Sequence, residues 1–362
     1  MSDYDKPPEL YDGLRLHQNE NTGGCSPRVL AALASLRPDQ VAFYPPYKAV
    51  VDECAGHLGV TPASVALTNG LDEGILAVAI TCLRPLPGGE VPEAIVPQPA
   101  FEIFEVNASV AGGRPVHVPP RPDFAFALDE VLAAITGQTR VVFLTNPNNP
   151  TGVSMPMAAI KIIAARVPRE AVVFVDEAYA DFAGASFVPE LPAFPNVIVG
   201  RTFAKAHGLA GLRIGALIGA PDALAPIRRA IGVYSVNIAA VVALQAALQD
   251  SAHVSDYLRQ AQESKALVYA VCDRLGLKYW KSDANFVLVH TGGQTDRLVD
   301  AAAARGVYLR DRGSEPGWRA NQSIRFLAGG KVRPAHRAKE KRLPNLYGQK
   351  RQYSSVASHS PS

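Results

Sequence analysis

Six short apolar segments between residues 65 and 219 alternate with longer segments of helical length and pattern. Each apolar segment is rich in Val, Ile and Phe and is too short to form a helix. Their nearly continuous hydrophobicity is typical of a largely parallel sheet that helices cover on both faces. The pattern therefore predicts a doubly wound α/β domain. The expected strands are VALT (65–68), EAIVP (93–97), RPVHV (114–118), RVVFLTN (140–146), AVVFVD (171–176) and NVIVGRT (196–202).

The pattern changes after residue 219, and it predicts a second, smaller α+β domain in the C-terminal part of the chain. Helical stretches rich in Ala, Leu and Arg come first, over residues 221–232 and 238–275, and a long helix joins the two domains. Strand-like segments follow at 285–290, 306–311 and 323–328. We expect an N-terminal segment (1–44) that packs with the small domain, a large domain (45–235), a small domain (236–330) and a basic, disordered tail (331–362).

The charge of the chain is divided unevenly between the tail and the rest. The formal charge of the 362 residues is +3, but residues 331–362 hold eight Lys or Arg against one acidic residue. The other 330 residues hold 28 basic and 32 acidic residues, a net charge of −4. The folded part is therefore expected to be mildly acidic, and nothing in its charge predicts a surface for nucleic acid.

Cysteine spacing and the apolar segments indicate a cytoplasmic protein. The four cysteines are far apart and form no CxxC pair, so neither disulfides nor a metal site is expected. The N-terminal MSDYDKPPELYDG is acidic and has no apolar core, so it does not resemble a signal peptide. The most apolar window, residues 230–248, contains several polar residues and is interpreted as a buried helix with its entry loop, not a membrane span.

Polar residues follow three of the predicted strands, at the edge where open parallel sheets bind ligands. One strand runs into NPNNPTG (146–152), a second ends in Asp176 with Tyr179 three residues later, and a third leads to Lys205 and then Arg213. Burying a carboxylate and an amine there costs free energy unless they pair or bind a ligand. A structural Asp–Lys ion pair would account for either residue alone. The whole set favours a ligand site.

Eight motifs stand in order along residues 16–326. They are LHQNEN (16–21), FYPPY (43–47), TNGLDEGI (68–75), NPNNPTG (146–152), VDEAYADF (175–182), RTFAKAHGLAGLRIG (201–215), GVYLRDRG (306–313) and NQSIRF (321–326). In this order they resemble the motifs of the fold-type I pyridoxal-phosphate enzymes, specifically the class I/II aminotransferases. Within that group the chain looks most like the histidinol-phosphate aminotransferases. The resemblance implies a homodimeric transaminase of amino-acid biosynthesis that takes an amino group from a donor, histidinol phosphate as the best candidate, and gives it to a 2-oxo acid such as 2-oxoglutarate.

The same resemblance implies a role for each residue of the central set. Lys205 would bond to the aldehyde of pyridoxal phosphate and move a proton, two tasks that require a primary amine. Asp176 would face the pyridine nitrogen and keep it protonated. Tyr179 and Asn149 would hydrogen-bond the phenolic oxygen of the cofactor. Arg213 would clamp its phosphate, because a guanidinium matches two phosphate oxygens.

The remaining candidate residues are likewise implied by the resemblance. The segment Gly70, Leu71, Asp72, Glu73 would hold the cofactor phosphate at a helix N-terminus, with Thr202 beside it. Phe101 would stack on the cofactor ring, although a lone Phe is more often core packing. Tyr44 would reach the phosphate bound to the partner subunit. Residues expected to bind substrate are Asn19, Arg310 and Arg325.

Three features depart from the family pattern. Ala204 stands where the family has a serine that contacts the phosphate, so weaker but not abolished cofactor binding is expected. Only about 15 residues precede the first motif, so little chain is expected to cover the substrate. After residue 326 the family continues with a closing helix, and no amphipathic period is present here.

Two alternatives remain open. The first is a decarboxylase of the same fold that acts on a phosphorylated amino acid, because the lysine and aspartate motifs do not distinguish the two reactions. Release of carbon dioxide without consumption of 2-oxoglutarate would identify it. The second is a non-enzymatic binding protein that uses its basic tail, which would show as salt-sensitive DNA binding lost on deletion of residues 331–362.

Overall fold

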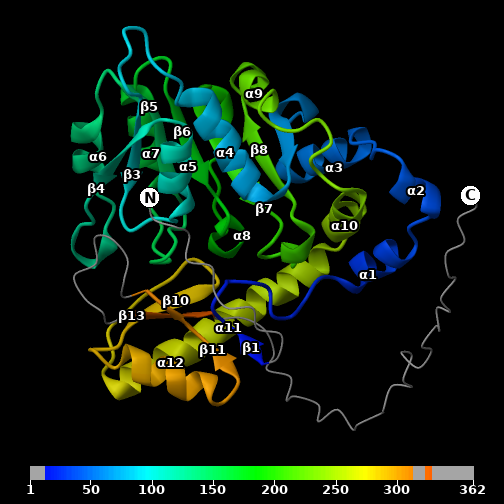
Figure 1. Ribbon diagram of the computed structural model, residues 1–362. Helices are drawn as coiled ribbons and strands as arrows, with labels where there is room; N and C mark the ends of the chain where they lie inside the picture. The colour runs from blue at the N-terminus through cyan, green and yellow to red at the C-terminus, as the bar shows by residue number, and fades with distance from the viewer. Residues whose placement is uncertain (1–12, 313–322, 328–362) are drawn as a thin grey trace, which may run out of the picture. The chain divides into compact units, whose positions relative to one another are not determined.

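The computed structural model describes residues 13–312 and the backbone of residues 323–327 (Figure 1). These residues form a seven-stranded sheet with helices on both faces, a four-stranded antiparallel sheet and a two-stranded ribbon. The basic tail expected at 331–362 lies outside the described residues, as does the segment expected to close the small domain.

The large sheet has the strand order β2-β8-β7-β6-β5-β3-β4. Strand β8 is antiparallel to both of its neighbours, and the remaining pairings, β3 with β4 and β5, β5 with β6, and β6 with β7, are parallel. The predicted doubly wound, largely parallel domain is therefore confirmed. Its strands are β2 (Val65–Thr68), β3 (Glu93–Pro97), β4 (Arg114–Val118), β5 (Thr139–Thr145), β6 (Val172–Asp176), β7 (Val197–Thr202) and β8 (Gly215–Gly219).

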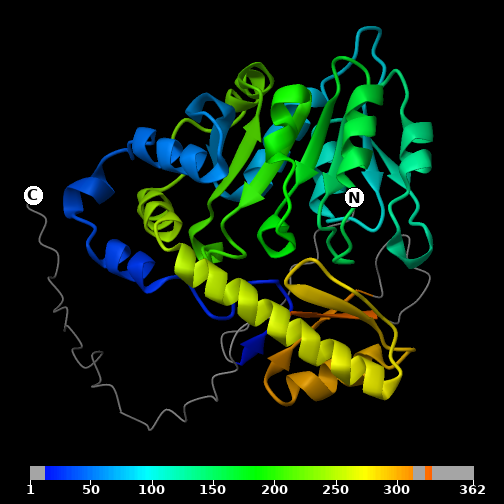
Figure 2. The same ribbon diagram turned by 180° about the vertical axis from the view of Figure 1, so that it is seen from behind.

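Successive residues of the strands enter two separate hydrophobic clusters, one on each face of the sheet. On β6, for example, Val173 and Val175 belong to the cluster that also holds buried residues of α1, α3, α6, α7 and α10, whereas Phe174 belongs to the cluster with those of α4, α5 and α9. Figures 1 and 2 show these two faces in turn. The helices are α1 (Pro27–Ala34), α2 (Pro38–Ala42), α3 (Lys48–Leu58), α4 (Gly70–Cys82), α5 (Ile103–Val110), α6 (Leu128–Ala134), α7 (Met157–Arg166), α8 (Ala180–Ala183), α9 (Pro221–Arg228), α10 (Ile238–Leu248), α11 (Ser251–Leu275) and α12 (Thr295–Ala303).

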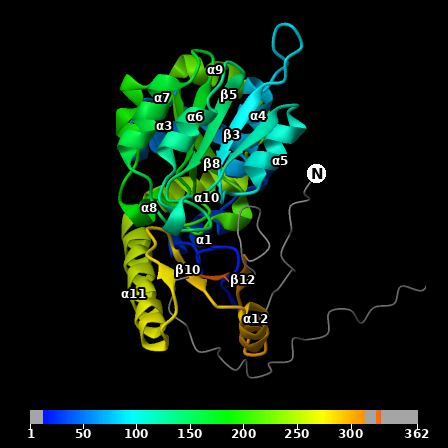
Figure 3. The ribbon, with the colours of Figure 1, turned by 90° about the vertical axis from the view of Figure 1, so that its left-hand side faces the viewer.

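The second sheet follows the long helix α11 and has the order β12-β13-β10-β9. Helix α11 packs against β10 and α12 packs against β12, and Figure 3 shows the two helices beside these strands. Residues 306–311, expected as one strand, form two short strands that pair in different sheets. Strand β11 pairs with β1 and β12 pairs with β13. The strands are β1 (Leu14–Arg15), β9 (Tyr279–Trp280), β10 (Phe286–His290), β11 (Val307–Tyr308), β12 (Arg310–Asp311) and β13 (Ser323–Leu327).

Two separate helices replace the continuous helical stretch expected over residues 238–275. The carboxylate of Asp250 accepts a hydrogen bond from the backbone N–H of His253 and so caps a new helix, α11. The buried residues of α10 belong to the hydrophobic cluster of the large sheet, and α10 packs against α1 and α3. This packing favours a domain boundary after α10, and the limits of the domains stay a prediction. No helix in the described ranges is long and apolar enough to cross a membrane.

Candidate active site

A cavity of about 320 Å³ lies where the ends of β6 and β7, the start of α4, the N-terminal loop and β12 meet. This size is typical of a site for a small molecule. Most of the residues singled out from the sequence line this one cavity. They are Asn19, Leu71, Asp72, Phe101, Asn149, Asp176, Tyr179, Thr202, Lys205, Arg213 and Arg310.

Lys205 and Asp176 line the cavity from the ends of two neighbouring parallel strands. The Lys205 ammonium donates to the carbonyl oxygen of Gln18 (3.0 Å) and lies 5.9 Å from the centre of the Tyr179 ring. Asp176 is 4% exposed, and its carboxylate accepts the backbone N–H of Ala178 (2.9 Å). Loss of solvation raises the pKa of Asp176 to about 7, against the opposing effects of that hydrogen bond and of Lys205. The carboxylate is therefore poised to receive a cationic partner.

Tyr179 is held in place by residues from distant parts of the chain. Its hydroxyl accepts a hydrogen bond from the side-chain amide of Asn19 (2.7 Å), and its ring packs edge-on against Phe286. The backbone carbonyl of Asn19 accepts in turn from the amide of Asn285 (3.3 Å). The buried Oδ1 of Asn19 has no hydrogen-bond partner among the described residues, so it is an acceptor that a bound molecule can satisfy.

Arg213 and the start of α4 form the end of the cavity suited to an anion. The Arg213 guanidinium pairs with Asp72 (2.8 Å) and donates to the carbonyl of Ala210 (3.3 Å). A Cβ on Gly70 would lie 2.4 Å from Nη2 of Arg213, so glycine is required for the guanidinium to reach this position. Gly70 also has a φ of +75°, which glycine adopts without strain. Backbone N–H groups of a helix start and a guanidinium are the donors that phosphate prefers.

Two residues of the predicted phosphate segment have other surroundings. The Glu73 carboxylate accepts from the backbone N–H of Asn69 (2.6 Å), and Glu73 is not among the residues that line the cavity. The Leu71 side chain is buried in the hydrophobic cluster beneath α4, although the residue borders the cavity. Thr202 borders the cavity, where its hydroxyl accepts from the backbone N–H of Ala204 (3.2 Å). Whether Ala204 weakens cofactor binding stays a prediction.

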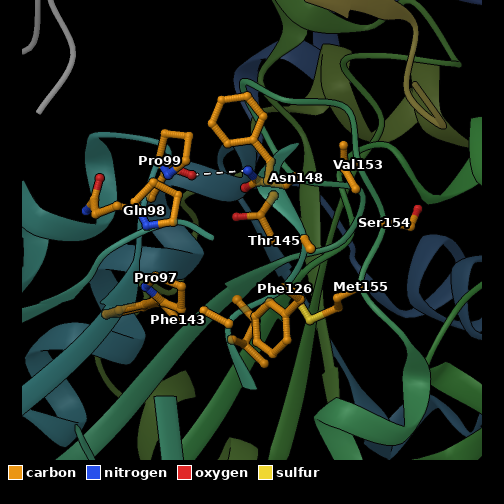
Figure 4. A pocket seen from close by; sticks show the side chains of 16 residues that line it. Pro97, Gln98, Pro99, Phe126, Phe143, Thr145, Asn148, Val153, Ser154 and Met155 are labelled. Carbon is orange, nitrogen blue, oxygen red and sulfur yellow. Dashed lines mark hydrogen bonds between the residues drawn. The ribbon is translucent and has the colours of Figure 1, made fainter. Parts of the chain in front are cut away.

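The NPNNPTG loop is held rigid by its own asparagines. Asn146 accepts from the backbone N–H of Met155 (2.9 Å). Asn148 donates to the carbonyl of Pro99 (3.1 Å). Figure 4 shows this hydrogen bond in the wall of a second, smaller pocket, which Pro99, Asn148 and Met155 help to line. Asn149 is therefore presented to the main cavity from a fixed loop. Phe101, on the facing segment, packs edge-on against Phe104.

The candidates that remain lie at the edges of this site or outside it. Arg310 lines the cavity, and in the register of β12 with β13 it lies opposite Arg325, whose side chain lies outside the described residues. Tyr44 does not line the cavity of its own chain. It is 75% exposed and stacks on Tyr234 with ring centres 4.1 Å apart.

A buried ion pair behind the cavity was not predicted. Glu177, which follows Asp176, pairs with Arg201 (Oε2 to Nη1, 3.2 Å) and accepts from the hydroxyl of Ser186 (2.6 Å). Arg201 also pairs with Asp181. These contacts join the ends of β6 and β7, and so they fix the strand ends that carry the site.

Sequence reasoning also missed His17, Glu102 and Arg312, which all line the cavity. Arg312 is two residues beyond Arg310. The alternation of side chains along extended backbone, which places residues i and i+2 on one side, was a signal that could have identified it.

Comparison with known proteins identifies similar sequences over most of the chain. Residues 11–336 match the family model of aminotransferase class I and II. A histidinol-phosphate aminotransferase of Moorella thermoacetica is 36% identical over 306 residues, covering 83% of this chain and 78% of the relative. An aromatic amino acid aminotransferase of Cutibacterium acnes is 35% identical over 305 residues, covering 83% and 85%.

A solved structure extends this similarity to the fold. The crystal structure of a histidinol-phosphate aminotransferase from Sinorhizobium meliloti, in complex with pyridoxal-5'-phosphate, superimposes with a TM-score of 0.78. It is 26% identical in sequence and covers 88% of this chain and 87% of its own. The fold class expected from the sequence is confirmed by this match.

Proposed function

Because the chain belongs to the class I and II aminotransferases, we propose that it uses pyridoxal phosphate to transfer an amino group from histidinol phosphate to a 2-oxo acid such as 2-oxoglutarate. The observation that carries the proposal is that an amine, a buried carboxyl and a phenol line one cavity. These groups are Lys205, Asp176 and Tyr179. Donor and acceptor would use this one site in turn, as in a ping-pong reaction.

The residues present fit pyridoxal phosphate. Arg213 and the first turn of α4 supply donors for its phosphate. Because Gly70 has no Cβ, the Arg213 guanidinium has room to lie beside this turn. Asp176, whose pKa burial raises, gains a partner if a protonated ring nitrogen lies beside it. Asn149 and Tyr179 supply hydrogen-bond donors for a ring oxygen.

The cofactor would supply an aldehyde and an electron-withdrawing ring that makes the Cα proton of the amino acid more acidic. Lys205 would accept and return that proton at Nζ. The Asp176 carboxylate would hold a positive charge on the ring nitrogen, and Tyr179, oriented by Asn19, would donate its hydroxyl proton as a hydrogen bond. The buried walls of the cavity would strengthen each of these interactions by excluding water.

Arg310 supports a substrate with an anionic group at its far end, since a guanidinium binds either a phosphate or a carboxylate. We propose Arg325 as a second contact and Asn19 as the acceptor for the substrate amine. The names of the relatives favour histidinol phosphate as the amino donor. Because the relative from Cutibacterium acnes is an aromatic amino acid aminotransferase, aromatic amino acids are a second class of donor to test.

We further propose that the enzyme is a cytoplasmic homodimer in which Tyr44 contacts the cofactor phosphate of the partner subunit. The exposed, stacked pair of Tyr44 and Tyr234 supports a contact at this surface. The four cysteines are unpaired, in keeping with a reducing compartment.

Borohydride reduction tests the lysine assignment directly. Protein loaded with pyridoxal phosphate should be yellow, and reduction should fix the cofactor covalently on the peptide that contains Lys205. Lys205→Ala should abolish this label, whereas Lys281→Ala, which removes an exposed lysine, should keep it. A label that survives in Lys205→Ala would refute the assignment.

A donor screen tests the reaction. Histidinol phosphate, phenylalanine and aspartate are offered with 2-oxoglutarate, and spectral conversion of the cofactor and formation of glutamate are measured. We expect histidinol phosphate to give the highest kcat/KM. Carbon dioxide release without consumption of 2-oxoglutarate would identify the decarboxylase instead.

A further inference from the structure

Glu102 and Arg312 form an ion pair in the wall of the main cavity (Oε1 to Nη2, 3.2 Å). The Arg312 side chain is only 4% exposed, whereas that of Glu102 is 29% exposed. Arginine keeps its charge even when buried, so the charge of Arg312 acts in a poorly solvated region. The neighbouring carboxylate offsets much of that charge. We call these two residues the Glu102–Arg312 pair.

The pair joins the cofactor side of the cavity to the substrate side. Glu102 directly follows Phe101, the aromatic proposed to stack on the cofactor, and it lies at the start of α5. Arg312 directly follows β12, which carries Arg310, the residue proposed to receive the anionic end of the substrate. Because Arg310 and the pair line the same cavity, we expect a change of charge at the pair to act on the group that Arg310 binds.

The other acidic residues of the cavity wall are placed differently. Asp72 pairs with Arg213 at the phosphate end, and Glu20 pairs with Arg15. Asp176 lies beside Lys205 at the centre of the site. Glu102 differs from these residues in that it pairs with Arg312, a cation next to β12.

We propose that the Glu102–Arg312 pair sets how strongly the site prefers doubly charged over singly charged ligands. Arg312 raises the affinity for a dianion such as a phosphate monoester, and Glu102 limits that gain. Balanced charges would let one site accept a phosphorylated donor and a singly charged amino acid. This inference rests on the proposed function and deepens it, because it concerns the charge class of the substrate.

The two halves of the pair should have opposite effects on selectivity. Removing the carboxylate with Glu102→Gln takes away the negative charge that is paired with Arg312 in the cavity wall, and we expect the preference for a dianion to rise roughly five- to tenfold. Removing the cation with Arg312→Gln leaves Glu102 uncompensated, and we expect the preference to fall by a similar factor. The double variant restores the charge balance and should return close to the wild-type preference. A purely structural contact would weaken binding in both single variants alike.

The experiment measures dissociation constants by isothermal titration calorimetry with succinate, a dianion, and butyrate, a monoanion with the same number of carbons. The protein is the holoenzyme, with Glu190→Gln as a control that removes a carboxylate from a surface pair with Lys161. Selectivity is the ratio of the two dissociation constants. Arg312→Lys, which keeps the charge, should keep the selectivity if Arg312→Gln proves too unstable to measure. The shifts should shrink as ionic strength rises.

Opposite shifts in the single variants and recovery in the double variant support the inference. Equal losses in both single variants, unchanged ratios, or a double variant worse than either would overturn it. The same ligands are also titrated into protein without cofactor, which separates the role of the Glu102–Arg312 pair from the proposed transaminase function. A failed transaminase assay would refute the proposed function while the binding ratios still decided the role of the pair.

Discussion

Asp176 ends a strand whose other residues are apolar, and this position determines its chemistry. The strand delivers the carboxyl to the sheet edge while leaving it almost fully buried, and a buried carboxylate loses its solvation. Its pKa rises to about 7 for this reason. The cost in stability becomes useful once a cation binds beside the carboxylate, because the cation then replaces the lost water.

The raised pKa predicts a pH dependence of stability in the protein without cofactor. The folded protein holds the Asp176 proton more tightly than the unfolded chain, whose pKa is near the ordinary 3.8. The free energy of unfolding should therefore fall as pH rises from about 4 to 7, by at most about 4 kcal/mol from this group. Asp176→Asn should remove that contribution, so the variant gains stability relative to the wild type across this range.

Urea unfolding at pH 5 and pH 7.5 measures this effect, because contributions from all other groups cancel in the difference between the two proteins. When pyridoxal phosphate is bound, the stability difference between the wild type and Asp176→Asn should no longer change with pH in this way, since a cationic ring nitrogen lowers the pKa of Asp176. A stability difference that is equal at both pH values would contradict the pKa and the reasoning built on it.

Among the helices and strands, the sequence predicted those that a local pattern of residues determines. The bounds of β5, β6 and β7 were predicted to within one residue, because a short continuous run of Val, Ile and Phe is typical of a buried strand. Strand β8 was missed because it begins and ends in glycine. A Cβ on Gly215 would lie 2.8 Å from the backbone nitrogen of Leu71, a tertiary contact that the pattern does not reveal.

In the site, too, residues placed by a local pattern were predicted, whereas residues placed by tertiary packing were missed. Residues at strand ends, such as Asp176 and Lys205, could be placed together because parallel strands end at one edge. Glu102 and Arg312 are separated by more than 200 residues and meet only through the packing of β12 near α5. Their contact depends on how two sheets are arranged, and no local pattern encodes that arrangement.

The start of α4 offers a test of how backbone shape supports the anion end of the cavity. Gly70→Ala should cost about 1 kcal/mol of stability from its positive φ, and the new Cβ should displace Arg213. Gly59→Ala is a matched control, because Gly59 has a φ of +71° and a Cβ added to it would meet no described atom within 4 Å. Both variants should lose similar stability, but only Gly70→Ala should bind pyridoxal phosphate several-fold more weakly. Equal affinity for the cofactor in both variants would argue against a role for this turn.

At the scale of the whole molecule, large apolar side chains remain exposed beside the N-terminal helices. Phe43 and Tyr44 follow α2, and Tyr44 stacks on Tyr234 from the loop before α10. Val41 and Val233 are also exposed there. An exposed apolar group of this kind is typical of an interface between proteins. A homodimer would bury it and would bring Tyr44 close to a second cavity.

A subunit-mixing experiment tests whether the site is shared between subunits. Lys205→Ala should be inactive, and Tyr44→Ala should lose much of its activity because the partner's phosphate contact is gone. In a mixed dimer one site then lacks both residues, while the other has Lys205 from one chain and Tyr44 from its partner and is intact. An equal mixture that exchanges subunits freely should recover roughly a quarter of the wild-type activity, because half of the dimers are mixed and each has one intact site. If Tyr44 instead serves its own chain, every site in the mixed dimer lacks one of the two residues. Mixing would then restore no activity, and the shared site would be refuted.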